Sequence, residues 1–217
     1  MIHIRKSSEP QLLTQHRCSP NSTYENLPTD TKQAVLESLC AEQHNLCAYC
    51  TCRITADAVN GKGEKASREH FYPRHPEPPH EVRKDWDTRY SNLLAVCPGA
   101  HAKEHTCDTK KANRVISADP TSPHIIAQLH YKNDGTLYST DTALNDELNN
   151  ILNLNSRRRS LPESRRKVML KVKARVAKKL QKFHHECRSV LAELERRPEP
   201  YCGMALEWLR GKVDCNS

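Results

Sequence analysis

Apolar residues recur at helical spacing in two parts of the chain. The first part predicts a short amphipathic helix over residues 29–43, which begins at a cap of Thr29 and Asp30 and leads the chain to Cys47. The second part is an apolar stripe over the C-terminal third, which predicts one continuous helix of ~8 turns. The apolar residues of the first helix are Val35, Leu36, Leu39 and Cys40. Those of the second helix are Val168, Val172, Val176, Leu180, Phe183, Cys187, Leu191 and Leu194.

A pattern with a period of two precedes an Asp-Gly turn. Alternate positions are apolar from Ile125 to Tyr131, and the alternation stops at Asn133-Asp134-Gly135, which together predict a β-hairpin. Residues 1–28 show no period and contain Pro, Ser and Asn, so we expect an extended arm on the surface. Residues 74–91 include the sequence RHPEPPH, which predicts a surface loop.

These elements predict an α+β fold with a largely helical C-terminal part. We divide the chain into an N-terminal arm over residues 1–28, a central module over 29–118 and a C-terminal region over 119–217. The last region contains the predicted hairpin and the basic helix. At 217 residues the chain is long enough for one sizeable core, or for a small catalytic module with a helical extension.

Positive charge is concentrated in one segment of the chain. Residues 157–188 contain 13 Lys and Arg against two Glu, a net +11, whereas the whole chain carries +8. A basic helix of this kind can follow a nucleic-acid backbone, and it can equally be a solvated helix face or a docking surface for a protein. We take Lys110, Lys111, Arg165 and Arg166 as the candidate nucleic-acid-binding residues.

Cysteine is frequent, with ten residues in the chain. The first residues carry no secretory signal pattern, and no window approaches the ~18 apolar residues of a membrane-spanning helix. We therefore expect a cytoplasmic protein whose thiols are reduced or bind a metal. A disulfide-rich secreted protein is the alternative, which bound zinc and free thiols in the purified protein would exclude.

The sequence Cys47-Ala-Tyr-Cys50 has a two-residue spacing that lets both thiolates of a knuckle reach one tetrahedral Zn²⁺ ion. A second pair of ligands must come from elsewhere in the chain. Cys97 and Cys107 are the best candidates, although their separation is wider than that of a usual knuckle. We therefore predict a structural zinc site formed by these four cysteines.

Other residues near these four compete as zinc ligands. The insert between the second two cysteines contains His101 and His105, either of which could replace a cysteine. Cys52 is close enough to compete, but it falls outside the pair spacing. The remaining cysteines are isolated and mostly lie on or near apolar positions, so we assign them no metal chemistry. They are Cys18, Cys40, Cys187, Cys202 and Cys215.

An acid and a histidine stand side by side in the stretch Arg68-Glu69-His70-Phe71-Tyr72-Pro73. Neighbouring residues of a strand point to opposite faces of a sheet. Glu69 and His70 can therefore reach one centre only if the strand ends or bends there. The proline that follows favours such a junction between strand and loop.

The order of these motifs resembles that of the HNH nuclease superfamily. Its module runs from a CxxC pair to acid-His-x-x-Pro, then to Asn-Leu before a cysteine, and then to a cysteine followed by Asn, His or Asp at a helix start. The resemblance implies a zinc-stapled ββα-metal core in residues 29–118, embedded in a largely helical protein with a long C-terminal helix. The matching segments are Cys47 to Cys50, Glu69-His70-Phe71-Tyr72-Pro73, Asn92-Leu93-Leu94-Ala95-Val96-Cys97 and Cys107-Asp108-Thr109-Lys110.

The resemblance also implies a role for each catalytic candidate. His70 would be the general base that deprotonates water, and Asn92 would brace the loop and orient His70. Glu69 and Asp108 would hold one divalent ion, usually Mg²⁺, which neutralises the scissile phosphate of DNA or tRNA. Two positions depart from the usual motif, because Glu69 replaces an Asp and Asp108 stands where Asn or His is commoner.

A narrower resemblance extends over residues 33–170. The segments CAYC, EHFYP, NLLAVC, CDTKK, ILNLN and LPESRRKVM look like the PtuB family, the HNH nucleases of the Septu and retron antiphage defence systems. This resemblance implies a complex with an ABC-type ATPase, PtuA, and in retron systems with a reverse transcriptase and its DNA. The competing hypothesis is a zinc-stapled nucleic-acid-binding or scaffold module without catalysis, for which His70→Ala leaves activity in cells unchanged.

Overall fold

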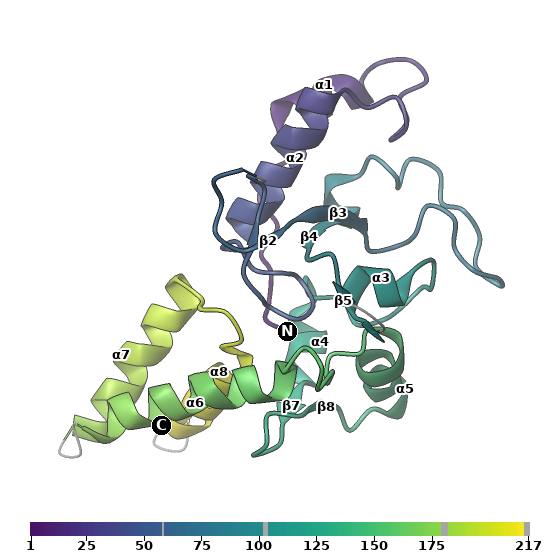
Figure 1. Cartoon of the computed structure of the whole chain (residues 1–217). Coiled ribbons are helices and arrows are strands. Elements are labelled where there is room, and N and C mark those ends of the chain that lie inside the picture. The colour runs from purple at the N-terminus through teal and green to yellow at the C-terminus, as the bar shows by residue number, and fades with distance from the viewer. Residues whose placement is uncertain (58, 102–103, 179–181, 215–217) are drawn as a thin grey trace.

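The computed structural model describes residues 1–57, 59–101, 104–178 and 182–214. Within these residues the chain forms eight α-helices and four two-stranded sheets, so the expected mixture of helices and strands is confirmed (Figure 1). The helices are α1 (Gln11–Arg17), α2 (Thr29–Glu42), α3 (Cys107–Lys111), α4 (Pro123–Ala127), α5 (Thr142–Asp146), α6 (Leu161–Ala177), α7 (Phe183–Arg196) and α8 (Gly203–Asp214). The strands are β1 (Ile54–Thr55), β2 (Glu64–Lys65), β3 (Ser67–His70), β4 (Leu93–Val96), β5 (Ala100–His101), β6 (Glu104–His105), β7 (His130–Tyr131) and β8 (Leu137–Tyr138). A 3₁₀ turn (Tyr90–Asn92) precedes β4, and a π-helical turn (Glu147–Ile151) extends α5.

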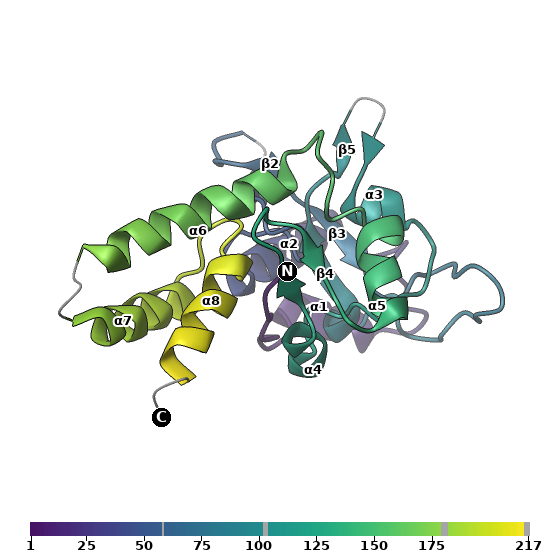
Figure 2. The same ribbon diagram turned by 90° about the horizontal axis from the view of Figure 1, so that it is seen from below.

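Buried apolar side chains form two clusters. The larger one runs from Met1 to Leu161 in the chain and packs α1 and α2 against β3, β4 and the turns around α5. The smaller one runs from Met169 to Leu209 and is formed by α6, α7 and α8, which make a separate lobe (Figure 2). Tyr131 of β7 packs against both clusters and so connects them. No helix in the described ranges is long and apolar enough to cross a membrane.

The longest strand pair is the part of the fold that positions the candidate catalytic residues. β3 and β4 are antiparallel, and His70 at the end of β3 pairs with Leu93 at the start of β4. Residues 71–92 connect the two strands, and α3 follows β4 after the small β5–β6 hairpin. Gln43, just after α2, ties that helix to β4, because its side chain exchanges hydrogen bonds with the backbone of Ala95 at 2.7 and 2.8 Å.

The first predicted helix is confirmed as α2, but its cap is not. The N-cap position is Pro28, and no side chain caps the helix. The β-hairpin is confirmed as β7 and β8, yet it is shorter than the alternating pattern. Residues 123–127 form α4 instead, because Pro123 stands at the start of the helix and the Ser122 hydroxyl accepts a hydrogen bond from the Ile125 amide.

The expectation of an extended surface arm over residues 1–28 is wrong in two respects. Residues 11–17 form α1, and Leu13 on its inner face is completely buried. Met1 and Ile4 are also buried in the larger cluster. Apolar residues that are few and irregularly spaced show no period, yet each of them fills a place in the core.

The single long C-terminal helix is also a wrong expectation. α6 ends at Ala177, α7 begins at Phe183, and both pack against each other and against α8. The apolar stripe continues across the break because each helix buries its own part of the stripe in the same cluster. Leu180, which belongs to the predicted stripe, lies outside the described residues.

Arg165 is buried, which corrects its assignment as a nucleic-acid-binding residue. Its side chain is 1% exposed. The guanidinium donates hydrogen bonds to the carbonyl oxygens of Gly135 and Leu154 and to the side-chain oxygen of Asn155. Arg165 therefore fastens α6 to the turn of the hairpin and to the segment before α6.

We expect Arg165→Met to lower the free energy of unfolding by ~3 kcal/mol, because buried carbonyl oxygens lose their donor. Urea unfolding followed by circular dichroism measures the change. The matched control is Arg166→Met at the neighbouring position, which is exposed and should leave stability nearly unchanged. Equal stability of the two variants would contradict a structural role for Arg165.

Candidate metal centre and catalytic residues

Five buried cysteines of the larger cluster have their sulfur atoms close together. They are Cys47, Cys50, Cys52, Cys97 and Cys107. The Sγ atom of Cys107 lies 3.9 Å from that of Cys47 and 3.7 Å from that of Cys97, and Cys50 and Cys97 are 3.7 Å apart. Cys52 also belongs here, because its Sγ and those of Cys47, Cys50 and Cys97 all lie within 4.8 Å of one another. The structure therefore brings together the four predicted zinc ligands and adds the cysteine that the spacing rule had set aside.

The local backbone explains how these cysteines meet. Cys47 and Cys50 lie in a turn just after α2, where the amide of Thr51 donates to the carbonyl of Cys47 at 3.0 Å. The adjoining Ala48 amide donates to the carbonyl of Ala95 in β4 at 3.0 Å, which ties the turn to the strand that ends before Cys97. Cys107 arrives as the first residue of α3.

These sulfur atoms fit a tetrahedral zinc ion. Thiolate ligands at the usual Zn–S distance of ~2.3 Å are separated from one another by roughly 3.8 Å. The three measured separations, 3.7 to 3.9 Å, match that value. The buried cluster can therefore hold a structural metal such as zinc, with four of its five thiols as ligands.

A buried arginine supports negative charge at the centre. The Arg159 guanidinium donates to the Cys97 Sγ at 3.3 Å and to the Thr106 hydroxyl at 2.9 Å, and it forms an ion pair with Glu64. The neighbouring Cys107 thiol lowers the pKa of Cys97 to about 5 and that of Cys50 well below its usual value. Deprotonated thiols are the form that binds zinc.

The histidine alternatives receive no support from the described residues. His105 is exposed on β6, and the His101 side chain and Cys215 lie outside the part of the chain that the structure describes. The isolated cysteines Cys18, Cys40, Cys187 and Cys202 are free thiols and do not belong to the sulfur cluster. Burial raises the pKa of Cys40 and Cys202 to about 11, so these two thiols stay protonated at neutral pH.

Asp108 on α3 is an electrostatic neighbour of Glu69 on β3. The Glu69 carboxylate lies 2.7 Å from the ammonium of Lys111 and accepts a hydrogen bond of 3.3 Å from the Tyr49 hydroxyl. Burial, together with a hydrogen bond to the Asp108 carboxyl group, raises the pKa of Glu69 well above its usual value, although the charge of Lys111 opposes this rise. Two carboxyl groups in contact need a shared proton or a cation between them.

His70 has a different set of neighbours. Its Nε2 lies 2.8 Å from the carbonyl oxygen of Asp87, and the Tyr24 ring packs edge-on against the imidazole with 4.5 Å between ring centroids. A carbonyl oxygen only accepts hydrogen bonds, so Nε2 carries the proton and Nδ1 has a free lone pair in the neutral ring. Burial lowers the pKa of His70 to about 4, which keeps the imidazole neutral at pH 7.

Asn92 fixes the loop that orients His70. Its side-chain amide donates to the carbonyls of Tyr72 at 3.0 Å and Trp86 at 2.9 Å, and its oxygen accepts from the Tyr72 amide at 2.8 Å. Both ends of the 71–92 connection are thereby held, including the residue next to Asp87. Between them, residues 77–85 are exposed, in agreement with the predicted surface loop.

The catalytic candidates Glu69, His70 and Asp108 do not form one set of metal ligands. Across the described residues, only the cysteine cluster brings together three or more Cys, His, Asp or Glu ligand atoms within 4.8 Å. Glu69 and His70 are consecutive on β3, and their side chains have separate partners. Lys111 links the two residues, because its ammonium also lies 3.3 Å from the carbonyl oxygen of His70.

Lys111 is completely buried, which corrects its assignment as a nucleic-acid-binding residue. Of the other candidates, Lys110 is half-buried and Arg166 is exposed. Sequence reasoning also missed the roles of Arg159, Tyr49 and the Asp87 carbonyl. Arg159 and Asp87 reach the site from other segments without a spacing signal, whereas Tyr49 lies inside the Cys47–Cys50 motif, whose spacing indicates only the cysteines.

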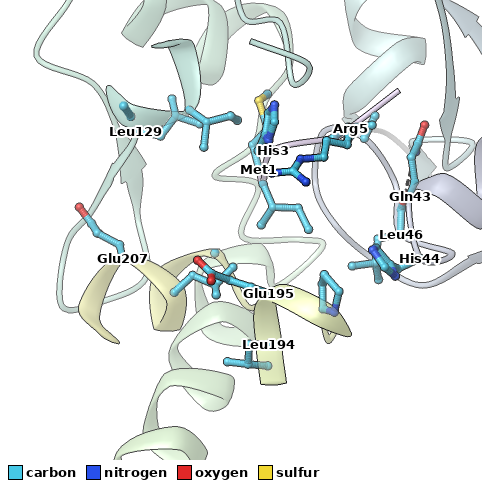
Figure 3. A pocket seen from close by; sticks show the side chains of 18 of the residues that line it. Met1, His3, Arg5, Gln43, His44, Leu46, Leu129, Leu194, Glu195 and Glu207 are labelled. Atoms are coloured by element: carbon cyan, nitrogen blue, oxygen red, sulfur yellow. Dashed lines mark hydrogen bonds between the residues drawn. The ribbon is translucent and has the colours of Figure 1, made fainter. Parts of the chain in front are cut away.

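A separate cavity of about 660 Å³ lies between the N-terminal segment, the end of α2, and helices α7 and α8 (Figure 3). Its lining includes Arg5, His44 and Glu195 and, at one edge, Cys47, but none of the catalytic candidates. Comparisons of the chain with models of protein families and with curated proteins find no match. The geometry of the residues, together with the motif resemblance, is therefore the basis for inferring function.

Proposed function

We propose that this protein is a metal-dependent endonuclease of the HNH type that hydrolyses phosphodiester bonds in DNA or tRNA. The observation that carries the proposal is the state of His70. A neutral imidazole with its Nε2 proton directed to a backbone carbonyl presents Nδ1 as a proton acceptor. The Asp87 carbonyl fixes the orientation of the ring, and a pKa of about 4 leaves the imidazole unprotonated at neutral pH, the form that accepts a proton.

The contact between Glu69 and Asp108 supports a divalent cation site. Both groups offer hard oxygen ligands, which suit Mg²⁺, and the nearby Asp108 carboxyl group is one of the causes that raise the pKa of Glu69. A bound Mg²⁺ ion supplies charge neutralisation for the scissile phosphate. Lys111 lies beside Glu69 and limits the negative charge of the pair before substrate binds.

A metal bound by the cysteine cluster would hold together the elements that carry Glu69 and Asp108. Cys97 directly follows β4, and Cys107 begins α3, the helix that carries Asp108. A metal held by both cysteines fixes the distance between the strand pair and the helix. It would thereby set the position of α3, which carries Asp108, relative to β3, which carries Glu69.

The remaining candidates for contacting nucleic acid are positive side chains that reach the solvent. Arg166 on α6 is exposed, and Lys110 on α3 is partly exposed beside Asp108. We further propose, from the motif resemblance, that the nuclease acts in an antiphage complex with an ABC-type ATPase, and in retron systems with a reverse transcriptase and its DNA. Such a partner would restrain cleavage until it is needed.

One observation favours the alternative of a non-catalytic zinc module. Glu69 is already satisfied by the Lys111 ammonium and the Tyr49 hydroxyl, as a purely structural carboxylate would be. In that case the cysteines would fold the module and the basic residues would bind nucleic acid without cutting it. Binding without Mg²⁺-dependent cleavage is the result that supports this alternative.

The test is cleavage of plasmid DNA and of total tRNA by the purified chain, alone and with its ATPase, in Mg²⁺ and in EDTA. We expect cleavage only in Mg²⁺. Asp108→Asn should reduce the rate ~10²-fold or more, because a metal ligand lost from the site weakens charge neutralisation at the phosphate.

The matched control for this test is Asp214→Asn at the end of α8, where the side chain is exposed. This variant should cleave at the wild-type rate. Asp108→Asn cleaving as fast as Asp214→Asn would overturn the assignment of the cation site.

A further inference from the structure

The metal centre contains more thiols than a tetrahedral ion can use. We propose that Cys52 and Cys107 are alternative fourth ligands of one structural metal ion, which Cys47, Cys50 and Cys97 hold in common. The choice between them decides whether the metal is attached to α3. The metal part of this inference is independent of the nuclease proposal, whereas its consequence for catalysis rests on that proposal.

The first argument is geometric. Cys107 contacts Cys47 and Cys97 at 3.9 and 3.7 Å and also neighbours Cys50. Cys52 neighbours the same three cysteines, and it completes with them the set of sulfurs that lie within 4.8 Å of one another. Cys107 is outside that set. At least one separation between Cys107 and a member of that set therefore exceeds 4.8 Å, so the five sulfurs cannot all surround one ion.

The second argument is that Cys52 is held in place. Its carbonyl oxygen accepts a hydrogen bond of 2.9 Å from the Cys47 amide. The residue before it, Thr51, has a φ of 63°, and this left-handed conformation turns the chain back toward the knuckle. Only 3% of Cys52 is exposed. The thiol is therefore presented to the three shared cysteines by the backbone.

The third argument concerns the cost of using Cys107. This residue has a φ of 53°, a conformation that strains a residue with a side chain by ~1 kcal/mol or more. Its amide donates to the carbonyl of Leu152 at 2.9 Å, which helps to hold the strained position. Release of Cys107 from the metal would allow the backbone to relieve this strain.

The exchange is a balanced ligand substitution. The bond between the metal and the Cys107 sulfur breaks, and a bond between the metal and the Cys52 sulfur forms. One proton moves from the Cys52 thiol to the released Cys107 thiolate, so the metal keeps four thiolate ligands and no oxidant is needed. The start of α3, with Asp108 next to Cys107, then loses its attachment to the metal.

The test uses the full-length chain, loaded with Zn²⁺ or with Co²⁺, and the variants Cys52→Ser, Cys107→Ser and the combination of both. Zinc content per chain and the thiolate-to-cobalt absorption band are measured. We expect each single variant to keep one metal ion with four-thiolate absorption. The combined variant should lose most of its bound metal, because only three thiolates remain for a tetrahedral site.

The matched control is Cys50→Ser, which removes one of the three shared cysteines and should weaken binding in the same way as the combined variant. The inference is overturned if Cys107→Ser weakens binding as much as Cys50→Ser while Cys52→Ser has no effect. Cys107 is then the sole fourth ligand. The reverse pattern would make Cys52 the sole fourth ligand and would equally overturn it.

A measurement on the zinc-loaded wild-type chain tests the inference even if the variants fail to fold. Slow alkylation by N-ethylmaleimide, followed by mass spectrometry, should label both Cys52 and Cys107 ahead of the three shared cysteines. Labelling of Cys52 alone overturns the inference. None of these readouts uses cleavage, so a failure of the nuclease proposal in the Asp108→Asn assay leaves the result for the metal interpretable.

Discussion

Replacement of His70 by alanine is expected to reduce Mg²⁺-dependent cleavage ~10²- to 10⁴-fold, the usual contribution of a positioned general base. In the proposed mechanism Nδ1 of this neutral imidazole accepts the proton of water, while Nε2 donates to the Asp87 carbonyl. The measurement is the initial rate of plasmid or tRNA cleavage at saturating Mg²⁺. Circular dichroism of the variant checks that the fold is kept.

A second substitution separates catalysis from packing. His70→Gln retains an amide group that can donate to the Asp87 carbonyl, but it offers no basic nitrogen. We expect it to lose activity as His70→Ala does and to keep wild-type stability. The control is His124→Ala on α4, where the imidazole is exposed. Normal cleavage by His70→Gln would show that the imidazole is not the base.

Removal of the structural metal is expected to unfold the central module. A structural zinc site contributes ~10 kcal/mol or more to folding, which is comparable with the entire stability of a domain. Cys50→Ser should therefore lose zinc and a large part of the helical and near-ultraviolet circular dichroism. Treatment of the wild-type chain with a strong chelator should have the same effect, and added Zn²⁺ should reverse it.

Cys18→Ser is the matched control for the metal experiment, because Cys18 is an exposed free thiol far from the cluster in sequence. It should bind one zinc ion and melt as the wild type does. A Cys50→Ser protein that keeps its zinc and its stability would contradict the metal centre itself. That outcome would also remove the three shared ligands.

The sequence predicts those parts of the fold whose signals are local. α2 follows from an amphipathic stretch that buries Val35 and Leu39 on one face, and the hairpin follows from its turn. The long C-terminal helix is a failed prediction for a physical reason. A periodic apolar stripe indicates which side of each helical turn is buried. The stripe is the same whether one helix continues or the chain turns and begins a second helix.

For the metal centre, too, the sequence predicts only the part that has a spacing signal. The ordered spacing of the motifs predicts that Cys47, Cys50, Cys97 and Cys107 meet, and their sulfurs do lie together. The inclusion of Cys52 depends on the left-handed backbone of Thr51, which residue preferences do not predict. The motif resemblance also implies a pair of Glu69 and Asp108, but not that Lys111 would be buried beside Glu69.

In the long connection between β3 and β4, the residues that orient His70 and the residues that are exposed to solvent lie in different places. Asn92 anchors both of its ends, while the tip over residues 77–85 is exposed. Extending a flexible loop to twice its length costs only ~0.6 kcal/mol in closure entropy. The tip can therefore accept insertions, such as a short epitope or a fluorescent label, without moving the histidine whose orientation depends on the anchored ends.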